Sequence, residues 1–331
     1  MDLHQLCLML SIRILRTGRI GCFEDMNDHI AILMGTYQGE RFLVEQLESI
    51  SKQTHKNWRL WVSDDGSTDA TVRIITEFQE RTHSAVTVLQ GPRKGFLQNF
   101  MSLICNVAID ADFYCFADQD DKWLPKKLER GLRWQQTQSR DVPALYCTRT
   151  RNVNADGKPI GFSPLFRRPP SFSNALVQSI SGANTMMMNR AARDLLIKAG
   201  RDVNVPSHDW WSYILTTGAG GIVHYDPIAE IDYRQHDGNQ VGSNSDFRAR
   251  LRRLRMLRSG RFREWSERHL SALALADPLL TVDNRRKVQL FRELHSGAFP
   301  KNLWALRAAG LYRQTIAGNI GLAVAAVLRQ I

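Results

Sequence analysis

The 331-residue sequence lacks the cysteine patterns that indicate a zinc site or a disulfide scaffold. Its five cysteines form no C-x-x-C pair and have no zinc-like spacing; they are Cys7, Cys22, Cys105, Cys115 and Cys147. Unpaired, scattered thiols are typical of proteins in a reducing compartment. We therefore expect a cytoplasmic protein without structural zinc or disulfides.

Glycine-rich phosphate loops and long apolar runs are also missing. No G-x-G-x-x-G follows the first apolar run and no G-x-x-x-x-G-K-[ST] occurs, which argues against a nicotinamide enzyme. The apolar stretch from Leu6 ends at Arg13, and the run 316–328 is too short to span a bilayer. We expect residues 1–28 to be a leader with Met26 as the native start, and residues 316–328 to form a docked or interfacial helix.

Acidic residues are scarce at one end of the chain only. Residues 248–331 carry 17 basic and 5 acidic side chains, a net charge of +12. Residues 1–247 carry 27 basic and 28 acidic side chains, a net charge of −1. Within 248–258, arginines alternate with Leu251, Leu254 and Leu257 at helical spacing. This segment is either an interfacial helix on an anionic membrane or a docked helix with solvated arginines. Nucleic-acid binding is a remote alternative, since no zinc-finger or RNP-like motif accompanies the charge.

The rest of the sequence alternates strands and helices. Apolar runs predict strands at 30–34, 59–63, 86–89 and 112–117. Helices are predicted at 41–51, at 96–109, and after residue 69 with Val72, Ile75 and Phe78 facing inward. This pattern indicates an α/β fold with a mostly parallel sheet. Polar clusters at 36–40, 64–69 and 118–121 each follow a strand directly, where such sheets bind ligands.

Two of these clusters are acidic. Asp118, Asp120 and Asp121 repel one another unless a cation such as Mg²⁺ or Mn²⁺ intervenes, or else they form a solvated turn in which Asp121 caps a helix. Asp64 and Asp65 end a strand, where a carboxylate can accept the imide N–H of a uracil or thymine. The same cluster also suits a helix start capped by Thr68 or Asp69.

Taken in order, the motifs resemble one enzyme family. They are Thr36-Tyr37-Gln38-Gly39-Glu40, Gln53-Thr54-His55-Lys56-Asn57-Trp58, Ser63-Asp64-Asp65-Gly66-Ser67-Thr68-Asp69 and Asp118-Gln119-Asp120-Asp121. Over residues 29–242 the chain resembles inverting family-2 glycosyltransferases of the GT-A fold. Ser207-His208-Asp209-Trp210-Trp211 and Tyr233-Arg234-Gln235-His236-Asp237-Gly238-Asn239 make it most similar to bacterial rhamnosyltransferase-like enzymes of surface polysaccharide synthesis. Residues 243–331 would then be a basic helical C-terminal extension.

The resemblance implies a nucleotide-sugar site. Its residues would be Thr36, Tyr37, Glu40, Asp64, Asp65, Lys94, Gly95, Asn99, Asp118 and Gly182. Asp65 would hold the base, and Gln38 stands where the family usually has Asn. The metal, Mg²⁺ or Mn²⁺, would be bound by Asp118, Asp120 and His236; His236 is alternatively a diphosphate contact beside Arg234.

Asp209 is the expected catalytic base, because an inverting transfer needs one carboxylate to take the proton of the acceptor hydroxyl. Its alternative role is to cap the following helix. Trp210 and Trp211, with His208, would form an apolar wall for the acceptor sugar. The resemblance implies dTDP-rhamnose as the donor, with a UDP-hexose or UDP-N-acetylhexosamine as the alternative. A glycan or lipid-linked saccharide would be the acceptor, and the enzyme could be peripheral at the inner membrane face.

Overall fold

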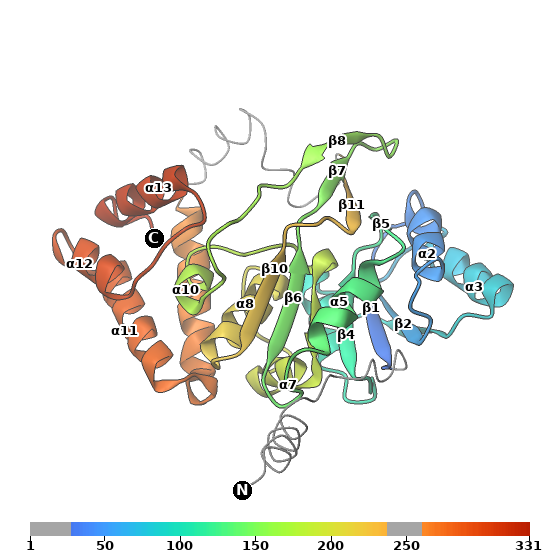
Figure 1. Ribbon diagram of the computed structural model, residues 1–331, viewed down its shortest axis with the longest axis horizontal. Helices are drawn as coiled ribbons and strands as arrows, with labels where there is room; N and C mark the ends of the chain where they lie inside the picture. The colour runs from blue at the N-terminus through green and yellow to red at the C-terminus, as the bar shows by residue number, and fades with distance from the viewer. Residues whose placement is uncertain (1–27, 237–259) are drawn as a thin grey trace, which may run out of the picture.

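The computed structural model describes residues 28–236 and 260–331 (Figure 1). The expected start at Met26, the basic segment 248–258 and the boundary after residue 242 lie outside the described residues. The described fold begins at Asp28, whose buried carboxylate accepts a hydrogen bond from the Arg140 guanidinium at 2.5 Å.

A seven-stranded sheet in the order β10-β6-β9-β4-β1-β2-β3 forms the centre of the molecule (Figure 1). All neighbours are parallel except β9, which is antiparallel to β4 and β6. The predicted parallel sheet and its first four strands are therefore confirmed. The strands are β1 (Ile30–Thr36), β2 (Trp58–Asp64), β3 (Val86–Gln90), β4 (Phe113–Ala117), β6 (Ala144–Thr148), β9 (Met187–Asn189) and β10 (Ile222–Asp226).

Helices cover both faces of this sheet. Alternating residues of β1 show why: Ile30, Ile32 and Met34 pack with one set of helices, and Ala31 and Leu33 with the other. The first set is α2 (Leu43–Ser51), α3 (Thr71–Thr82) and α5 (Lys127–Gln135). The second is α4 (Phe96–Ile104), α7 (Arg190–Ala199) and α8 (His208–Gly218).

Two local predictions about the helices are wrong. Helix α4 ends at Ile104 and not at Ile109, because the Asn106 side chain accepts the N–H of Ala108 in a turn at 3.0 Å. Val72 is 40% exposed, since the buried stripe of α3 runs through Thr71, Ile75 and Phe78.

A small four-stranded sheet lies beyond the carboxyl ends of the parallel strands (Figure 1). Its order is β5-β11-β7-β8. The strands are β5 (Lys122–Trp123), β7 (Arg151–Val153), β8 (Pro159–Phe162) and β11 (Ile231–Arg234), and two short helices, α6 (Phe172–Ala175) and η1 (Ala183–Thr185), follow β8 in the chain.

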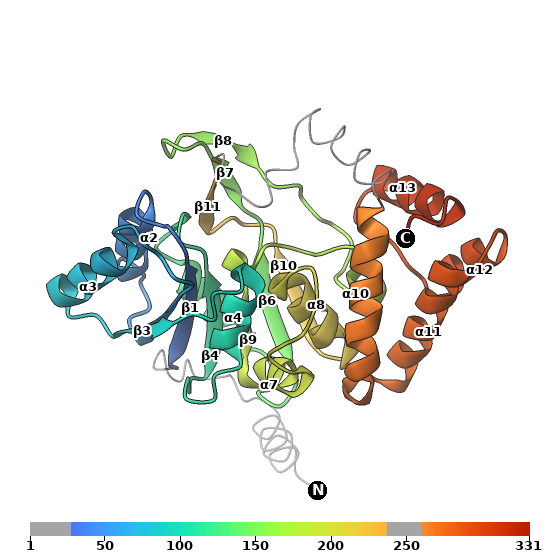
Figure 2. The same ribbon diagram turned by 180° about the vertical axis from the view of Figure 1, so that it is seen from behind.

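The C-terminal helices pack directly on the sheet domain (Figure 2). They are α10 (Arg261–Leu275), η2 (Asp277–Leu279), α11 (Val282–Ser296), α12 (Lys301–Ala308) and α13 (Ile316–Val327). Leu273 and Phe291 share one apolar core with Trp211 and Leu215 of α8. The extension is thus continuous with the core of the sheet domain. In the described part of the chain, no helix has both the length and the apolarity to cross a bilayer.

We expect the described cysteines to resist alkylation in the native protein. Burial raises the pKa of Cys105 and of Cys115 to about 11, and it raises the pKa of Cys147 further. Because the thiolate is the nucleophile, iodoacetamide at pH 7.5 should leave all three unlabelled. Peptide mass spectrometry before and after denaturation checks this, and rapid native labelling of Cys115 would contradict the packing.

Candidate active site

Asp64 organises the turn that follows β2. Its Oδ1 accepts the backbone N–H groups of Gly66 (3.2 Å) and Ser67 (2.8 Å). Its Oδ2 accepts the hydroxyls of Ser67 (2.6 Å) and Thr36 (2.9 Å). A carboxylate has about four acceptor positions, so these four donors satisfy Asp64. Asp64 therefore shapes the turn, and its expected contact with the nucleotide stays a prediction.

Asp65, by contrast, keeps free acceptor capacity. Its Oδ1 accepts the N–H of Arg93 (2.6 Å) and its Oδ2 accepts the N–H of Gly95 (2.8 Å). Two of about four positions remain for an imide N–H. Gly95 has φ +84° with open space around its Cα, so backbone conformation and not crowding calls for glycine there. Asp65 thus ties the loop before α4, which carries the exposed Lys94, to the end of β2.

Asn99 lies beneath these strand ends and not at their surface. It is 3% exposed, and its amide nitrogen donates to the backbone oxygens of Ser63 (2.8 Å) and Thr36 (3.4 Å). Thr36 itself is 1% exposed, and its hydroxyl is used by Asp64. Both side chains face the interior and hold β1 against β2, so the structure gives them a role in the fold, and their expected nucleotide contacts stay a prediction.

Asn99→Ala is expected to lower the free energy of unfolding by about 1–3 kcal/mol, because it removes a buried amide that serves two backbone oxygens. Urea denaturation measures the change. Nucleoside diphosphate affinity of the folded variant should stay close to that of the wild type. A variant of unchanged stability that binds nucleotide poorly would restore Asn99 as a direct contact.

The loop after β1 presents an exposed aromatic ring. Tyr37 is 58% exposed, and its backbone is clamped by the Gln119 amide at 2.9 and 3.0 Å. Gln38 adopts φ +49°, and its side chain accepts the N–H groups of Thr68 and Asp69. Glu40 accepts the N–H of Ala70 at 3.0 Å, which turns its carboxylate toward the start of α3. Tyr37 is therefore the side chain of this loop that is free to contact a base.

The N-cap of α3 is Ala70 and not Thr68 or Asp69, so the expected cap is wrong. Asp69 lies one residue earlier, and its Oδ1 accepts the N–H of Thr71 at 3.0 Å, whereas Thr68 makes no such bond to the helix among the described contacts. The polar cluster after β2 therefore has two functions in the fold. Its first half shapes the turn and its second half starts a helix.

The acidic loop after β4 contains one buried and two accessible carboxylates. Asp121 is fully buried, with Oδ2 accepting the Asn184 amide at 2.5 Å and Oδ1 accepting the N–H of Arg234 at 3.2 Å. Because α5 begins only at Lys127, the alternative that Asp121 caps a helix is wrong. Asp121 instead ties the acidic loop after β4 to η1 and to β11. The other two carboxylates of the loop, Asp118 and Asp120, are partly exposed.

The charge of Asp209 acts on the acidic loop. Burial raises the pKa of Asp118 to about 8, and the charges of Asp120 and Asp209 add to that rise. Burial also raises the pKa of Asp121, again with help from neighbouring carboxylates. Four carboxylates in one corner of the molecule repel one another, and a cation would relieve that repulsion.

His236 approaches the same loop from the end of β11. Its Nε2 lies 2.8 Å from Oδ2 of Asp120, and its ring packs on Phe42 at 4.8 Å. Arg234 is buried below them, donating to the backbone oxygen of Asp120 at 3.0 Å and pairing with Glu45. Arg234 thus supports the loop from its buried side, whereas His236 lies beside a partly exposed carboxylate.

Asp209 lies in the first turn of α8. Burial raises its pKa, although hydrogen bonds from the Ser207 hydroxyl and from the backbone N–H groups of Trp210 and Ala183 act in the opposite direction. The Trp210 N–H is 2.6 Å from Oδ1. Helix α8 starts at His208 after Ser207, so Asp209 contributes to the helix start without being its N-cap. The bond from Ala183 joins it to η1, directly after the exposed Gly182.

The residues around Asp209 differ from the expected apolar wall. Trp211 is 0% exposed and belongs to the core, so its expected contact with the acceptor is corrected. Trp210 is partly exposed, but its indole donates to the Ala175 oxygen at 2.6 Å and its ring packs on His269 and Trp265 of α10. His208 is buried and stacks on Phe100 at 4.1 Å; burial lowers its pKa to about 3, so it is neutral.

The chemistry of the donor set fits a hard divalent cation. Across residues 28–236 and 260–331, no three His, Cys, Asp or Glu side chains converge as a metal site built from protein alone. Asp120 and His236 do converge, and Mg²⁺ is commonly held by one or two carboxylates plus substrate phosphates and water. The residues present therefore suit a metal whose remaining ligands come from a phosphate-bearing substrate and water.

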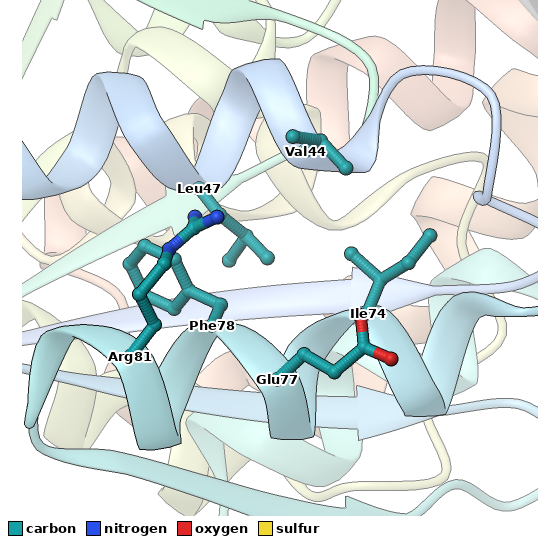
Figure 3. A pocket seen from close by; sticks show the side chains of 6 residues that line it. All are labelled: Val44, Leu47, Ile74, Glu77, Phe78 and Arg81. Atoms are coloured by element: carbon teal, nitrogen blue, oxygen red, sulfur yellow. The ribbon is translucent and has the colours of Figure 1, made fainter.

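The cavity between α2 and α3 is a separate feature. It has a volume of about 50 Å³ and is lined by Val44, Leu47, Ile74, Glu77, Phe78 and Arg81 (Figure 3). It is too small for a nucleotide sugar, since ligand pockets measure about 300–1,000 Å³. None of the candidate site residues lines it.

The structure thus brings Asp65, Asp118, Asp120, Asp209 and His236 to the carboxyl edge of the sheet. Sequence reasoning missed Asn184 and Gln119, whose amides fix the acidic loop. A signal existed only for Asn184, the one amide side chain in the small-residue stretch from Ser181 to Thr185, which precedes three methionines. Gln119 gave no sign, because its role depends on Tyr37, 82 residues earlier.

Comparisons with known proteins agree with this geometry. A family model described as Glycosyl transferase family 2 matches residues 31–196. The dTDP-rhamnosyl transferase RfbG of Shigella flexneri is 30% identical over 254 residues, 73% of this chain and 84% of that protein. The UDP-Glc:alpha-D-GlcNAc-diphosphoundecaprenol beta-1,3-glucosyltransferase WfgD of Escherichia coli is 30% identical over 108 residues, 32% of this chain and 41% of that protein. The crystal structure of GalNAc-T7 with UDP, GalNAc and Mn²⁺ has a TM-score of 0.53 at 10% identity, covering 89% of this chain and 57% of that one, a likeness of fold.

Proposed function

Because this chain belongs to glycosyl transferase family 2 and adopts the GT-A fold, we propose that it transfers rhamnose from dTDP-rhamnose. The acceptor would be a glycan or lipid-linked saccharide in bacterial surface polysaccharide synthesis. Similarity to a dTDP-rhamnosyl transferase over 73% of the chain supports this donor. A UDP-hexose or UDP-N-acetylhexosamine is the alternative, supported by the shorter match to a UDP-Glc enzyme.

The observation that carries the proposal is the meeting of Asp209 with the acidic loop. These groups come from the start of α8 and the end of β4, and the two elements touch: the rings of His208, next to Asp209, and Phe116, at the end of β4, have centroids 4.7 Å apart. The charges of Asp120 and Asp209 both raise the pKa of Asp118, in agreement with this contact. A carboxylate near a diphosphate-binding corner is what an inverting transfer requires, because base and leaving group act on opposite faces of one sugar.

Each side chain then has a proposed role. Asp65 accepts the imide N–H of thymine, and the exposed ring of Tyr37 lies beside the base. Asp209 accepts the proton of the acceptor hydroxyl while that oxygen attacks the anomeric carbon, and the configuration inverts. Asp209 is only partly exposed at the start of α8, and burial raises its pKa, which makes it a stronger base than an ordinary aspartate.

Asp120 and His236 would hold the divalent cation, with Asp118 beside them. Such a cation neutralises charge that develops on a departing diphosphate. Asp121, Asn184 and Arg234 keep the loop in place without touching substrate. The acceptor is proposed to be lipid-linked because the matching glucosyltransferase has a diphosphoundecaprenol acceptor in its name.

Release of nucleoside diphosphate tests the donor. The purified protein is incubated with dTDP-rhamnose, UDP-glucose, UDP-N-acetylglucosamine or GDP-mannose, each with Mn²⁺, Mg²⁺ or EDTA. Water takes the place of the glycan acceptor, so that slow donor hydrolysis releases the nucleoside diphosphate, and products are separated by ion-exchange chromatography. We expect metal-dependent release of dTDP above the other three. Release of UDP alone would move the assignment to the alternative donor, and release with no donor would contradict transfer.

A further inference from the structure

The last helix of the chain exposes an apolar stripe. In α13, aliphatic residues recur every four positions and therefore lie along one face. We call Ile316, Ile320 and Val324, together with the C-cap residue Leu328, the α13 stripe, and their exposed fractions are 82%, 61%, 44% and 56%. The opposite face, with Leu322, Ala325 and Ala326, is buried. The stripe is thus left over after the helix has packed on the protein.

A second apolar patch lies on β8, at the edge of the small sheet. Ile160 and Phe162 are 55% and 50% exposed, and because they are two residues apart they lie on one face of the strand. We call this pair the β8 patch. The Arg149 guanidinium lies over the Phe162 ring at 4.8 Å, so a cation accompanies the apolar surface.

The segment after β8 contacts the segment that precedes α13. The N–H of Arg168 donates to Gln314 Oε1 at 3.1 Å, and its guanidinium lies over the Tyr312 ring at 3.9 Å. The Ser171 hydroxyl also bonds to that of Tyr312 at 2.9 Å. Figures 1 and 2 show β8 above the sheet and α13 among the C-terminal helices, both on the side of the molecule toward which the parallel strands have their carboxyl ends. The candidate active site lies on this side.

Charge distinguishes the possible occupants of this surface. Residues 294–331 contain no Asp or Glu but carry four cations, Lys301, Arg307, Arg313 and Arg329. A second copy of the chain would bring like charges together, which costs free energy. An anionic bilayer instead offers opposite charge beside an apolar layer, and helices with apolar and basic faces lie in its interface.

We propose that the α13 stripe and the β8 patch dock this protein on the surface of an anionic phospholipid bilayer. The helix has 12 residues and would lie in the interface. Docking turns the carboxyl edge of the sheet toward the lipid. This inference rests on the proposed function in one respect: docking would bring the site close to a lipid-linked acceptor.

Vesicle flotation of the full chain tests the proposal. Vesicles are phosphatidylcholine alone or with 30% phosphatidylglycerol, at about 0.1 M salt. The α13 variant combines Ile320→Asp with Val324→Asp, and the β8 variant combines Ile160→Asp with Phe162→Asp. Val107→Asp is the matched control, because Val107 is 78% exposed but precedes β4, at the opposite end of the strands.

We expect the wild type to float with anionic vesicles and at least tenfold less with neutral ones. Each double variant should partition at least tenfold less than the wild type, and Val107→Asp should match it. Equal flotation of all proteins, or no flotation of the wild type, would overturn the proposal. So would an α13 variant that only converts a dimer to a monomer in light scattering. Nucleoside diphosphate titration of the same variants should be unchanged, so a failure to bind nucleotide bears on the proposed function alone.

Discussion

Asp209→Asn is expected to lower kcat by about 10²–10⁴-fold, the usual contribution of a positioned general base, while nucleotide affinity stays near the wild-type value. The asparagine keeps the shape of the side chain and can still accept the N–H groups of Trp210 and Ala183. It cannot take a proton from an acceptor hydroxyl. Steady-state transfer assays and calorimetric titration with nucleotide measure the two quantities separately.

The pH profile follows from the direction of the pKa shift. A base works only when ionised, and burial raises the pKa of Asp209 above the usual aspartate value. The wild-type kcat should therefore fall as pH decreases through this raised pKa, at a higher pH than an ordinary aspartate would give. Asp202→Asn is the matched control, since Asp202 is exposed in the loop before α8. An Asp209→Asn enzyme with wild-type kcat would contradict the assignment. So would a variant that loses nucleotide affinity by the same factor as it loses activity.

Asp120→Asn is expected to weaken metal-dependent donor binding by about 100-fold or more. Groups that merely support a metal ligand already change affinity by about 10–100-fold, and Asp120 is proposed as a direct ligand. Binding measured in EDTA should change little, because the proposed contact of Asp65 with the base lies outside this loop, where Asp65 accepts the N–H groups of Arg93 and Gly95. Calorimetry with dTDP, with and without Mn²⁺, gives both values.

His236→Ala and Asp283→Asn complete this test. His236 lies 2.8 Å from Asp120 and should share the loss of metal dependence, whereas the exposed Asp283 of α11 should not. Normal metal and donor affinity in His236→Ala would remove the histidine from the proposed ligands. Equal loss in EDTA and in Mn²⁺ for Asp120→Asn would indicate a damaged fold and not a missing ligand.

The sheet could be predicted because its strands are buried on both faces. Runs such as Ile30 to Met34 read as continuous apolar segments, and polar clusters mark where each ends. The position of the site along the chain follows from that pattern. The helical C-terminal region was also expected, but its shared core with α8 was not visible, because contacts such as Phe291 with the sheet domain link distant residues.

Which polar side chain faces outward could not be predicted. Asp64 and Asp65 are neighbours of the same type, and only the donors around each show that one is satisfied and the other is not. Likewise Trp210 and Trp211 are adjacent, and the rotation of α8 on the sheet decides that Trp211 enters the core. Such choices depend on three-dimensional partners that local sequence does not encode.

The most direct test of the central claim is calorimetric titration of the wild-type protein with dTDP, UDP and GDP, each in Mn²⁺ and in EDTA. The proposed site predicts that dTDP binds with a clear preference in Mn²⁺ and much more weakly in EDTA. Absence of binding for all three nucleotides under both conditions would contradict the account.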